Sequence, residues 1–411
     1  MRISPFAALR PQPELAARVA AVPYDVVNSE EARRLADGNP LSFLHVSRSE
    51  IDLPADTNPY SDAVYQRALA NLRQLEREAL LREASPSTYV YRQETTLLGQ
   101  AVRQTSLVCC GHVEEYASGI IKRHEKTRRD KEDDRTRHTL TLRANAGPVF
   151  LMYRDRPSID QLIERETTQA PLYDFVAVDG VRHQVWRCSD AKPYVEQFAR
   201  VEASYIADGH HRAASAARTG QELRAANPHH DGSEEYNWFL CALFPASQLT
   251  ILPYHRVLKD LNGLSPAGLI EKLKQVGTVS PTSQPEPPAP GSFCVYVDKR
   301  WHLVSFAAQS IDASDPVGSL DYSLLGERVL APILGIGDIR SDQRIDFVGG
   351  IRGPGELVKR VDSGRDAVAF SMHATTIEHL LRVADAGQIM PPKSTWFEPK
   401  LRSGLLLHTL D

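Results

Sequence analysis

The chain of 411 residues has few cysteines, and their spacing is unlike that of metal or redox ligands. They are odd in number, widely spread and without a Cys-x-x-Cys pair: Cys109, Cys110, Cys188, Cys241 and Cys294. This pattern argues against a zinc site, a redox dithiol or a disulfide framework. We therefore expect a protein of the reducing cytoplasm.

An excess of charge of one sign is also missing. The 48 basic and 52 acidic residues give a formal net charge of −4, so no global field would gather nucleic acid or an anionic membrane. No long apolar segment follows the N-terminus, and the apolar stretches are short and broken by prolines and charges. We expect neither a nucleic-acid partner nor a membrane partner.

What remains is the composition of a globular enzyme, with 42% hydrophobic residues. Apolar residues recur at helical spacing over 61–81, which predicts an amphipathic helix. Alternating residues flank Asp179-Gly180, which predicts a hairpin over 175–186 with a two-residue type I′ turn. Hairpins mixed with helices predict an α+β fold of mixed sheets and packed helices, without regular βαβ winding.

Prolines crowd the segment 280–291. We expect such a segment to join neither helix nor sheet. It predicts a linker over 279–291, between an N-terminal core with inserted hairpins and helices (1–278) and a C-terminal α/β region (292–411).

The segment Asp208–Arg212 reads Asp-Gly-His-His-Arg and lies between a buried strand and an alanine-rich helix. A flexible Gly209, free helix N-terminal amides and the fixed charge of Arg212 together suit a phosphate group. His210 and His211 add donors or a proton-transfer group. The alternative is a capped helix with incidental histidines.

Two further clusters carry polar side chains. In the first, His124 and Glu125 could handle protons and phosphate charge, whereas the charged run over 128–138 is typical of a solvated helix face. The second contains Lys393-Ser394-Thr395 and Lys400, but it lacks the glycine pattern of a Walker A loop. Its lysines and hydroxyls could still contact phosphate, or it could be a surface loop.

Two weaker signals lie elsewhere. Tyr24-Asp25 ends a short apolar strand, and Asp25 is a candidate base or magnesium ligand, although a lone Asp is more often a cap or turn residue. His255-Arg256 follows a strand and could be a ligand or a structural edge.

Taken together, these segments resemble the domain-of-unknown-function 1015 family over nearly the whole chain. The quoted elements are Pro23-Tyr24-Asp25, His124-Glu125-x-Thr127, Asp208–Arg212, His255-Arg256 and Pro392–Lys400. The Gly-His-His-Arg element is also similar to the nucleotide-binding turn of the ParB and sulfiredoxin superfamily, some of whose members phosphorylate free serine. The resemblance implies a ParB/sulfiredoxin-like nucleotide-binding core and a free serine kinase.

Departures from these relatives narrow the choice. Sulfiredoxins carry a cysteine where this chain has His210-His211, so sulfinic acid reduction would lack its nucleophile. ParB proteins add a helical DNA-reading module, which this chain lacks in pattern and in charge. A ParB-like nucleotide-dependent DNA-binding or regulatory protein remains the alternative.

The resemblance implies a role for each candidate residue. Gly209, His210, His211 and Arg212 would hold the phosphates of ATP or ADP, with Asp208 or Asp25 helping to bind Mg²⁺. The sequence leaves pyrophosphate open as a third phosphoryl donor. Asp25 or Glu125 would accept the serine hydroxyl proton, and His124 and His210 would assist the transfer. Donor or substrate contacts are expected from Lys393, Ser394, Thr395 and Lys400. Substrate contacts are expected from Tyr24, Lys122, Thr127, His255 and Arg256. The oligomeric state stays open.

Overall fold

The computed structural model describes residues 1–411, which divide into two compact units. Unit 1 comprises residues 1–123, 127–249 and 399–411, and unit 2 comprises residues 124–126 and 250–398. The chain therefore leaves unit 1 after Leu249 and returns to it at Pro399. As a result, Lys393, Ser394 and Thr395 belong to unit 2, whereas Lys400 belongs to unit 1.

Unit 1 is built on a nine-stranded mixed sheet. The path of the sheet runs β6-β11-β8-β12-β5-β4-β10-β9, and β1 pairs with β5. Two pairs are parallel, β6 with β11 and β8 with β12, and the others are antiparallel. The strands are β1 (Ile3–Ser4), β4 (Tyr89–Leu97), β5 (Gln100–His112), β6 (Ile121–Lys122), β8 (Val149–Tyr153), β9 (Tyr173–Val176), β10 (Arg182–Arg187), β11 (Ser204–Asp208) and β12 (Trp238–Pro245). Two small sheets pair β2 (Leu9–Pro11) with β3 (Leu80–Arg82), and β7 (Ala144–Asn145) with β21 (His408–Thr409).

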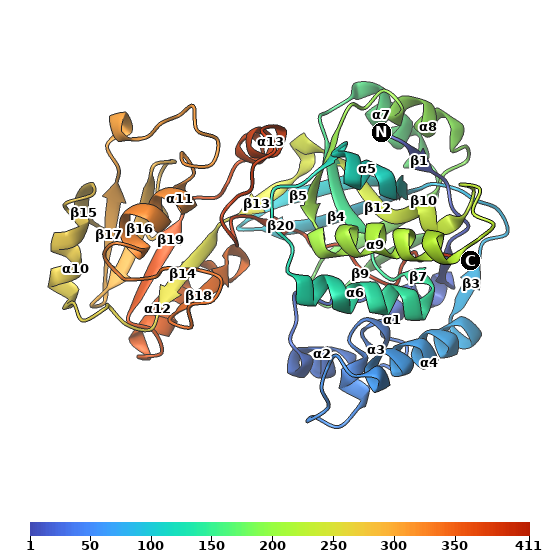
Figure 1. Ribbon diagram of the computed structural model, residues 1–411, viewed down its shortest axis with the longest axis horizontal. Helices are drawn as coiled ribbons and strands as arrows, with labels where there is room; N and C mark the ends of the chain where they lie inside the picture. The colour runs from blue at the N-terminus through green and yellow to red at the C-terminus, as the bar shows by residue number, and fades with distance from the viewer. The chain divides into compact units, whose positions relative to one another are not determined.

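Two long helices, α6 and α9, pack side by side in unit 1 (Figure 1). The predicted amphipathic helix over 61–81 is confirmed as α4, whose apolar face packs with the N-terminal helices in one core cluster. The helices of unit 1 are α1 (Ala16–Val19), α2 (Ser29–Ala36), α3 (Leu44–Ser47), α4 (Asp62–Glu78), α5 (Val113–Ser118), α6 (Arg129–Leu142), α7 (Pro157–Glu166), α8 (Lys192–Phe198) and α9 (His210–Ala226). None of the helices in either unit is long and apolar enough to span a bilayer.

The hairpin predicted around Asp179-Gly180 is present as β9 and β10, but its turn type was predicted wrongly. The pairing ends at Val176 opposite Arg182, so the loop is longer than two residues. Only Gly180 of the two turn residues has a positive φ, of 80°, whereas a type I′ turn requires a positive φ at both. The Gly180 N–H donates to the Ala177 carbonyl and closes a turn over residues 177–180. The left-handed Gly180 then leads the chain back into β10, which explains the longer loop.

Unit 2 is built on a six-stranded antiparallel sheet in the order β15-β17-β16-β19-β14-β18. Its strands are β14 (Tyr254–Leu258), β15 (Thr278–Thr282), β16 (Ser292–Val297), β17 (Arg300–Ser305), β18 (Ile345–Gly349) and β19 (Val368–Met372). A separate pair joins β13 (Thr250–Leu252) to β20 (Trp396–Glu398). The helices are α10 (Pro266–Leu273), α11 (Asp321–Leu325), α12 (Gly353–Asp362) and α13 (Ile377–Asp385). Both units mix helices and sheets, so the predicted α+β class is confirmed.

The segment expected to be a linker over 279–291 lies inside unit 2, and its first part is not a linker in conformation. Residues 278–282 form β15 and pair with β17, with Pro281 opposite His302. Proline is tolerated there because β15 is an edge strand, so the missing N–H removes no hydrogen bond from a second neighbour. The expectation that this segment cannot join a sheet was wrong for that reason.

A buried ion pair in unit 2 offers a test of this fold. Arg360 on α12 donates from Nε to Asp366 Oδ2 and from Nη2 to Asp346 Oδ2, each at 2.7 Å, and the Asp366 side chain is 1% exposed. Arg360→Met would leave Asp366 buried without its cation, so we expect the free energy of unfolding to fall by about 3–5 kcal/mol. Denaturant unfolding measures this loss.

The matched control is Arg365→Met, because Arg365 is 65% exposed and only 3.8 Å from Asp346. This variant should change the free energy of unfolding by less than about 0.5 kcal/mol. If both variants lower the free energy of unfolding by the same amount, the buried ion pair does not stabilise unit 2 more than an exposed arginine does.

Candidate functional site

The segment Asp208–Arg212 forms a strand-to-helix turn, as the sequence predicts. Strand β11 ends at Asp208, Gly209 adopts the left-handed conformation with φ of 87°, and α9 begins at His210. No side chain caps α9, so the N–H groups of its first turn keep their donor capacity. The turn therefore offers open helix amides, the feature that favours anions at helix N-termini.

Four charged side chains gather at this turn. Lys400 Nζ lies 3.2 Å from Asp208 Oδ2, and Arg212 Nη2 lies 3.8 Å from the same oxygen. Arg212 Nη2 also lies 4.0 Å from Asp25 Oδ2. Burial opposes ionisation of Asp208, but the charges of Lys400 and Arg212 outweigh it and hold the pKa of this carboxyl well below its usual range. We call these four residues the charge cluster.

The backbone around Lys400 is fixed by two glutamines that sequence reasoning missed. Gln93 donates to the Lys400 carbonyl at 2.9 Å, and Gln104 donates to the Pro399 carbonyl at 3.0 Å. Gln104 also donates to Gln93 Oε1, and both side chains are fully buried on neighbouring strands β4 and β5. A pair of buried glutamines in adjacent strands was the available signal, because buried amides need partners.

The two histidines of the turn have different surroundings. His210 is buried, with 5% of its surface exposed. His211 Nε2 accepts the Arg128 backbone N–H at 3.1 Å, so its proton resides on Nδ1. Burial lowers the pKa of His211 despite the opposing charges of Asp25 and Glu132. His211 is therefore a neutral imidazole at pH 7, which suits a hydrogen-bond donor better than a fixed cation.

Lys122 and Thr127 also lie in unit 1, but their polar groups are engaged locally. The Lys122 ammonium lies 5.7 Å from the ring centroid of Tyr205, its register partner on β11. The Thr127 hydroxyl donates to the Glu132 carboxylate at the start of α6. This contact assigns Thr127 to the start of the helix, and the expected substrate contact would require its hydroxyl to change partners.

Helix α6 corrects the expectation that residues 128–138 form a solvated face. Asp134 and His138 are buried, and the side chain of Arg135 is only 13% exposed. Arg135 pairs with Asp134 at 2.7 Å and lies over the Tyr24 ring at 4.2 Å. The missed signal was the four-residue spacing of Asp134, His138 and Leu142, which places them on one buried face.

In unit 2 the structure brings His124 together with the Lys-Ser-Thr segment. His124 Nε2 lies 3.3 Å from Thr395 Oγ1, and the His124 carbonyl accepts the Met390 N–H at 2.8 Å. Ser394 is buried and donates to the Pro391 carbonyl at 2.7 Å. The Ser394 hydroxyl is thus used within the loop, and its predicted contact with phosphate would require it to change partners. Glu125 belongs to the same unit and is half-buried.

Lys393 and Thr395 remain the candidate polar contacts of that segment. Lys393 has a left-handed backbone, with φ of 59°, and its ammonium lies 5.5 Å from the Tyr254 ring centroid. Thr375 holds the neighbouring backbone by donating to the Ser394 carbonyl at 2.7 Å. The loop is therefore fixed by hydrogen bonds on both sides of Lys393.

His255 and Arg256 are buried in unit 2, so their predicted substrate contacts would require their polar groups to change partners. His255 accepts the Met372 N–H. Burial, and to a smaller extent the nearby charge of Arg256, lowers the pKa of His255 to about 4. Arg256 is 1% exposed and donates to the carbonyls of Tyr254 and Pro392. Its guanidinium also lies 4.3 Å from the Tyr322 ring centroid. Arg256 thus fixes the loop at Pro392 from inside the core.

The carboxylates of the charge cluster were also predicted as magnesium ligands. The structure contains no group of three or more His, Cys, Asp or Glu side chains placed to hold a metal ion. Mg²⁺ that accompanies a nucleotide usually takes one or two carboxylates, with phosphates and water completing its shell. Asp25 and Asp208 both lie within 4.0 Å of Arg212 Nη2, and their role as magnesium ligands stays a prediction.

The fold and the turn thus define an α+β protein with a strand-to-helix turn, lined by charged side chains, in its larger sheet. The family model described as "Protein of unknown function (DUF1015)" matches residues 3–323. The chain belongs to this family, as its motifs predict. No curated protein matches the sequence.

Solved structures also match, each over 73% of this chain. A free serine kinase mutant in complex with AMP matches with a TM-score of 0.38 and 12% identity over 92% of its length. A conserved hypothetical protein from Pyrococcus furiosus matches with a TM-score of 0.37 and 13% identity over 94%. C-terminally truncated SbnI from Staphylococcus aureus matches with a TM-score of 0.39 and 12% identity over 87%.

The left-handed glycine of the turn can be tested by substitution. A Cβ on Gly209 would lie 2.8 Å from Arg212 Nε, so Gly209→Ala must displace the guanidinium from the charge cluster as well as strain the backbone. We expect it to lower the free energy of unfolding by about 1–2 kcal/mol from the backbone alone. Displacing a charged hydrogen-bonding group should add about 1.5 kcal/mol or more.

The control is Gly119→Ala, since Gly119 has φ of 80° but no atom within 4 Å of a Cβ. Gly119→Ala therefore strains the backbone in the same way, but its new methyl group meets no other atom. Denaturant unfolding of both variants measures the difference, and equal losses would show that Arg212 moves at no cost.

Proposed function

We propose that this protein is a kinase that transfers a phosphoryl group from ATP or ADP to the hydroxyl of free L-serine. The observation that carries the proposal is the approach of Arg212 and Lys400 to the uncapped start of α9, through their shared contact with Asp208. Phosphoryl transfer needs positioned cations and amides more than covalent chemistry. The charge cluster supplies both kinds of group at one turn.

The donor phosphates would bind at the first turn of α9. Amides after Gly209, the Nδ1–H of His211 and the cations Arg212 and Lys400 would contact phosphate oxygens. His210, at the first position of the same helix, is retained as a candidate of this site.

Mg²⁺ would accompany the donor for reasons of charge. Two carboxylates and two cations make the charge cluster neutral as a whole, so it offers no surplus of positive charge to a polyanion. Asp25 and Asp208 would hold the ion together with the phosphates, and the bound ion would supply the missing positive charge.

The general base would be Asp25 or Glu125. Asp25 belongs to the charge cluster and its side chain is 34% exposed, so a substrate hydroxyl could reach it. Glu125 is the competing candidate, beside His124 in unit 2. Lys393 and Thr395 would contact the donor phosphates or the substrate carboxylate. The choice of serine rests on the similarity of the Gly-His-His-Arg turn to that of free serine kinases.

The proposal is tested by incubating the protein with Mg²⁺, L-serine and either ATP or ADP, and following phosphoserine by phosphorus NMR. We expect phosphoserine with at least one donor. Arg212→Met should weaken nucleotide binding about 10- to 100-fold, because a charged hydrogen bond contributes about 1.5–3 kcal/mol. Arg224→Met, on the last turn of α9 with a 56% exposed side chain, should leave binding unchanged.

Nucleotide binding without phosphoserine from either donor would refute the serine kinase. Retarded migration of duplex DNA at moderate salt in that case would favour the ParB-like alternative.

A second experiment separates the two candidate bases. Replacing the true base should lower kcat about 10²- to 10⁴-fold and leave nucleotide affinity within about threefold. We expect this behaviour from Asp25→Asn, and a smaller effect from Glu125→Gln. If Asp25→Asn instead weakens Mg²⁺ dependence without lowering kcat at saturating Mg²⁺, Asp25 is a metal ligand and not the base.

A further inference from the structure

Unit 1 contains a cavity beside the charge cluster, with apolar residues such as Val149 and Phe239 in its wall and polar side chains among them. It has a volume of about 40 Å³, and its lining includes Tyr24, Ser47, Arg135, His138, Asn145 and Arg212. This volume holds about three water molecules, so its occupant is no larger than a small amino acid. Arg212 belongs both to the cavity wall and to the charge cluster.

One hydroxyl in the wall lacks a partner. Ser47 is 6% exposed, and its Oγ has no hydrogen-bond partner in the protein. A buried hydroxyl without a partner is costly, so an occupant that hydrogen-bonds to it is favoured. Ser49, two residues later, is also buried, but its Oγ donates to the Val64 carbonyl at 2.7 Å and is absent from the lining. The two serines therefore form a natural comparison.

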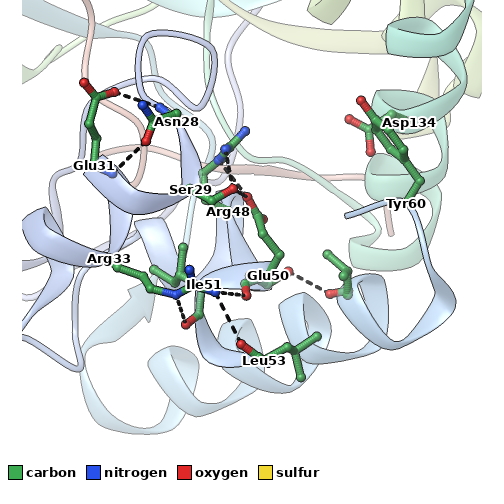
Figure 2. A network of polar contacts seen from close by, with 12 residues as sticks. Asn28, Ser29, Glu31, Arg33, Arg48, Glu50, Ile51, Leu53, Tyr60 and Asp134 are labelled. Atoms are coloured by element: carbon green, nitrogen blue, oxygen red, sulfur yellow. Dashed lines mark hydrogen bonds and ion pairs between the residues drawn. The ribbon is translucent and has the colours of Figure 1, made fainter. Parts of the chain in front are cut away.

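A polar network fixes the backbone that follows Ser47 (Figure 2). Arg48 Nη2 donates to Ser29 Oγ at 3.0 Å, and that hydroxyl donates to Glu50 Oε1 at 2.9 Å. Arg33 donates to the carbonyls of Glu50, Ile51 and Leu53 and clamps the next turn. The backbone that carries Ser47 into the following residues is therefore fixed by side-chain hydrogen bonds before any ligand arrives.

The other walls add both donors and acceptors. His138 Nε2 donates to the Val46 carbonyl at 3.0 Å, which leaves Nδ1 as an acceptor, and burial with the charge of Arg135 lowers the pKa of His138 to about 4. Asn145 Oδ1 accepts the Leu240 N–H at 3.1 Å, so its Nδ2 is a donor. Guanidinium and amide donors suit a carboxylate, and imidazole and hydroxyl acceptors suit an ammonium group. This set of groups matches a small zwitterion.

We propose that this cavity is the acceptor pocket, and that it holds a small polar α-amino acid beside the donor phosphates. The assignment rests on the proposed kinase function and extends it by locating the acceptor. In the step, the amino acid hydroxyl oxygen forms a bond to the terminal phosphorus of the nucleotide. The bond from that phosphorus to the bridging oxygen breaks, the shortened nucleotide leaves, and the hydroxyl proton passes to the carboxylate that serves as general base.

Two variants test the pocket directly. Ser47→Ala removes the unpartnered hydroxyl, and Ala216→Leu fills the cavity from its lining on α9. With Mg²⁺ and a non-hydrolysable nucleotide present, calorimetry should show the Kd of L-serine rising about 5- to 10-fold in Ser47→Ala, as expected for one hydrogen bond. Ala216→Leu should abolish serine binding. Nucleotide affinity should stay within about twofold in both.

Ser49→Ala is the matched control. It should lower the thermal midpoint, because it removes a satisfied buried hydrogen bond, and leave serine affinity unchanged. Ser47→Ala should show the opposite behaviour, with no loss of thermal stability. If Ser47→Ala and Ser49→Ala lower the affinity for L-serine to the same extent, the effect comes from a change in the local backbone. That result would overturn the pocket.

The remaining outcomes separate the pocket from the kinase. If the wild type forms phosphoserine but neither Ser47→Ala nor Ala216→Leu raises the KM for serine, the pocket is wrong and the kinase stands. If no phosphoserine forms, but L-alanine, L-threonine or L-homoserine raises the thermal midpoint and Ala216→Leu cancels this, the pocket stands and the serine kinase fails. If none of L-serine, L-alanine, L-threonine and L-homoserine raises the thermal midpoint of the wild type, the pocket is refuted.

Discussion

The return of residues 399–411 to unit 1 is the constraint on which the candidate site depends. Leu9 pairs with Leu407 and Ala21 with Ser403, and β21 pairs with β7. These contacts tie the C-terminal segment across the N-terminal part of the unit. The same segment carries Lys400 into the charge cluster, where it meets Asp208. Without this return, β11 and α9 would still form their turn, but it would hold only one of its two cations.

Charge balance accounts for the arrangement of side chains at the turn. Asp208 and Asp25 offset Arg212 and Lys400, so no buried charge is left alone. A phosphate would compete with Asp208 for the same two cations, unless a divalent ion joined the carboxylates to the phosphate oxygens. Arg256 shows the contrasting case, because its guanidinium meets carbonyls and aromatic rings and no carboxylate. That arginine is a structural cation, and burial lowers its pKa to about 10.

Helix α9 connects the donor site to the cavity. Arg212 is in its first turn, and Ala216 is four residues later on the same face. The helix N-terminus therefore lies at the proposed phosphate site, while the side of the helix forms a cavity wall. Helix α6 completes that wall with Arg135 and His138. The side-by-side packing of α6 and α9 (Figure 1) thus sets the width of the proposed acceptor pocket.

The sequence by itself determined the local elements of this protein and its family. A buried strand, one glycine and an alanine-rich run predicted the turn at Asp208–Arg212, since strand, turn and helix signals act over a few residues. The motifs predicted the family in the same way. Site roles that depend on local geometry, such as the left-handed Gly209, were accessible at this level.

Only the tertiary structure decided which side chains meet. Lys400 and Asp208 are 192 residues apart in the chain, and no periodic pattern links them. Burial likewise separated Arg256, whose donors are taken by carbonyls, from Arg212, which lines a cavity. The hydroxyl of Ser47 became a candidate contact only because folding left it buried without a partner. Local sequence encodes backbone conformation, whereas long-range pairing and burial follow from how the whole chain packs.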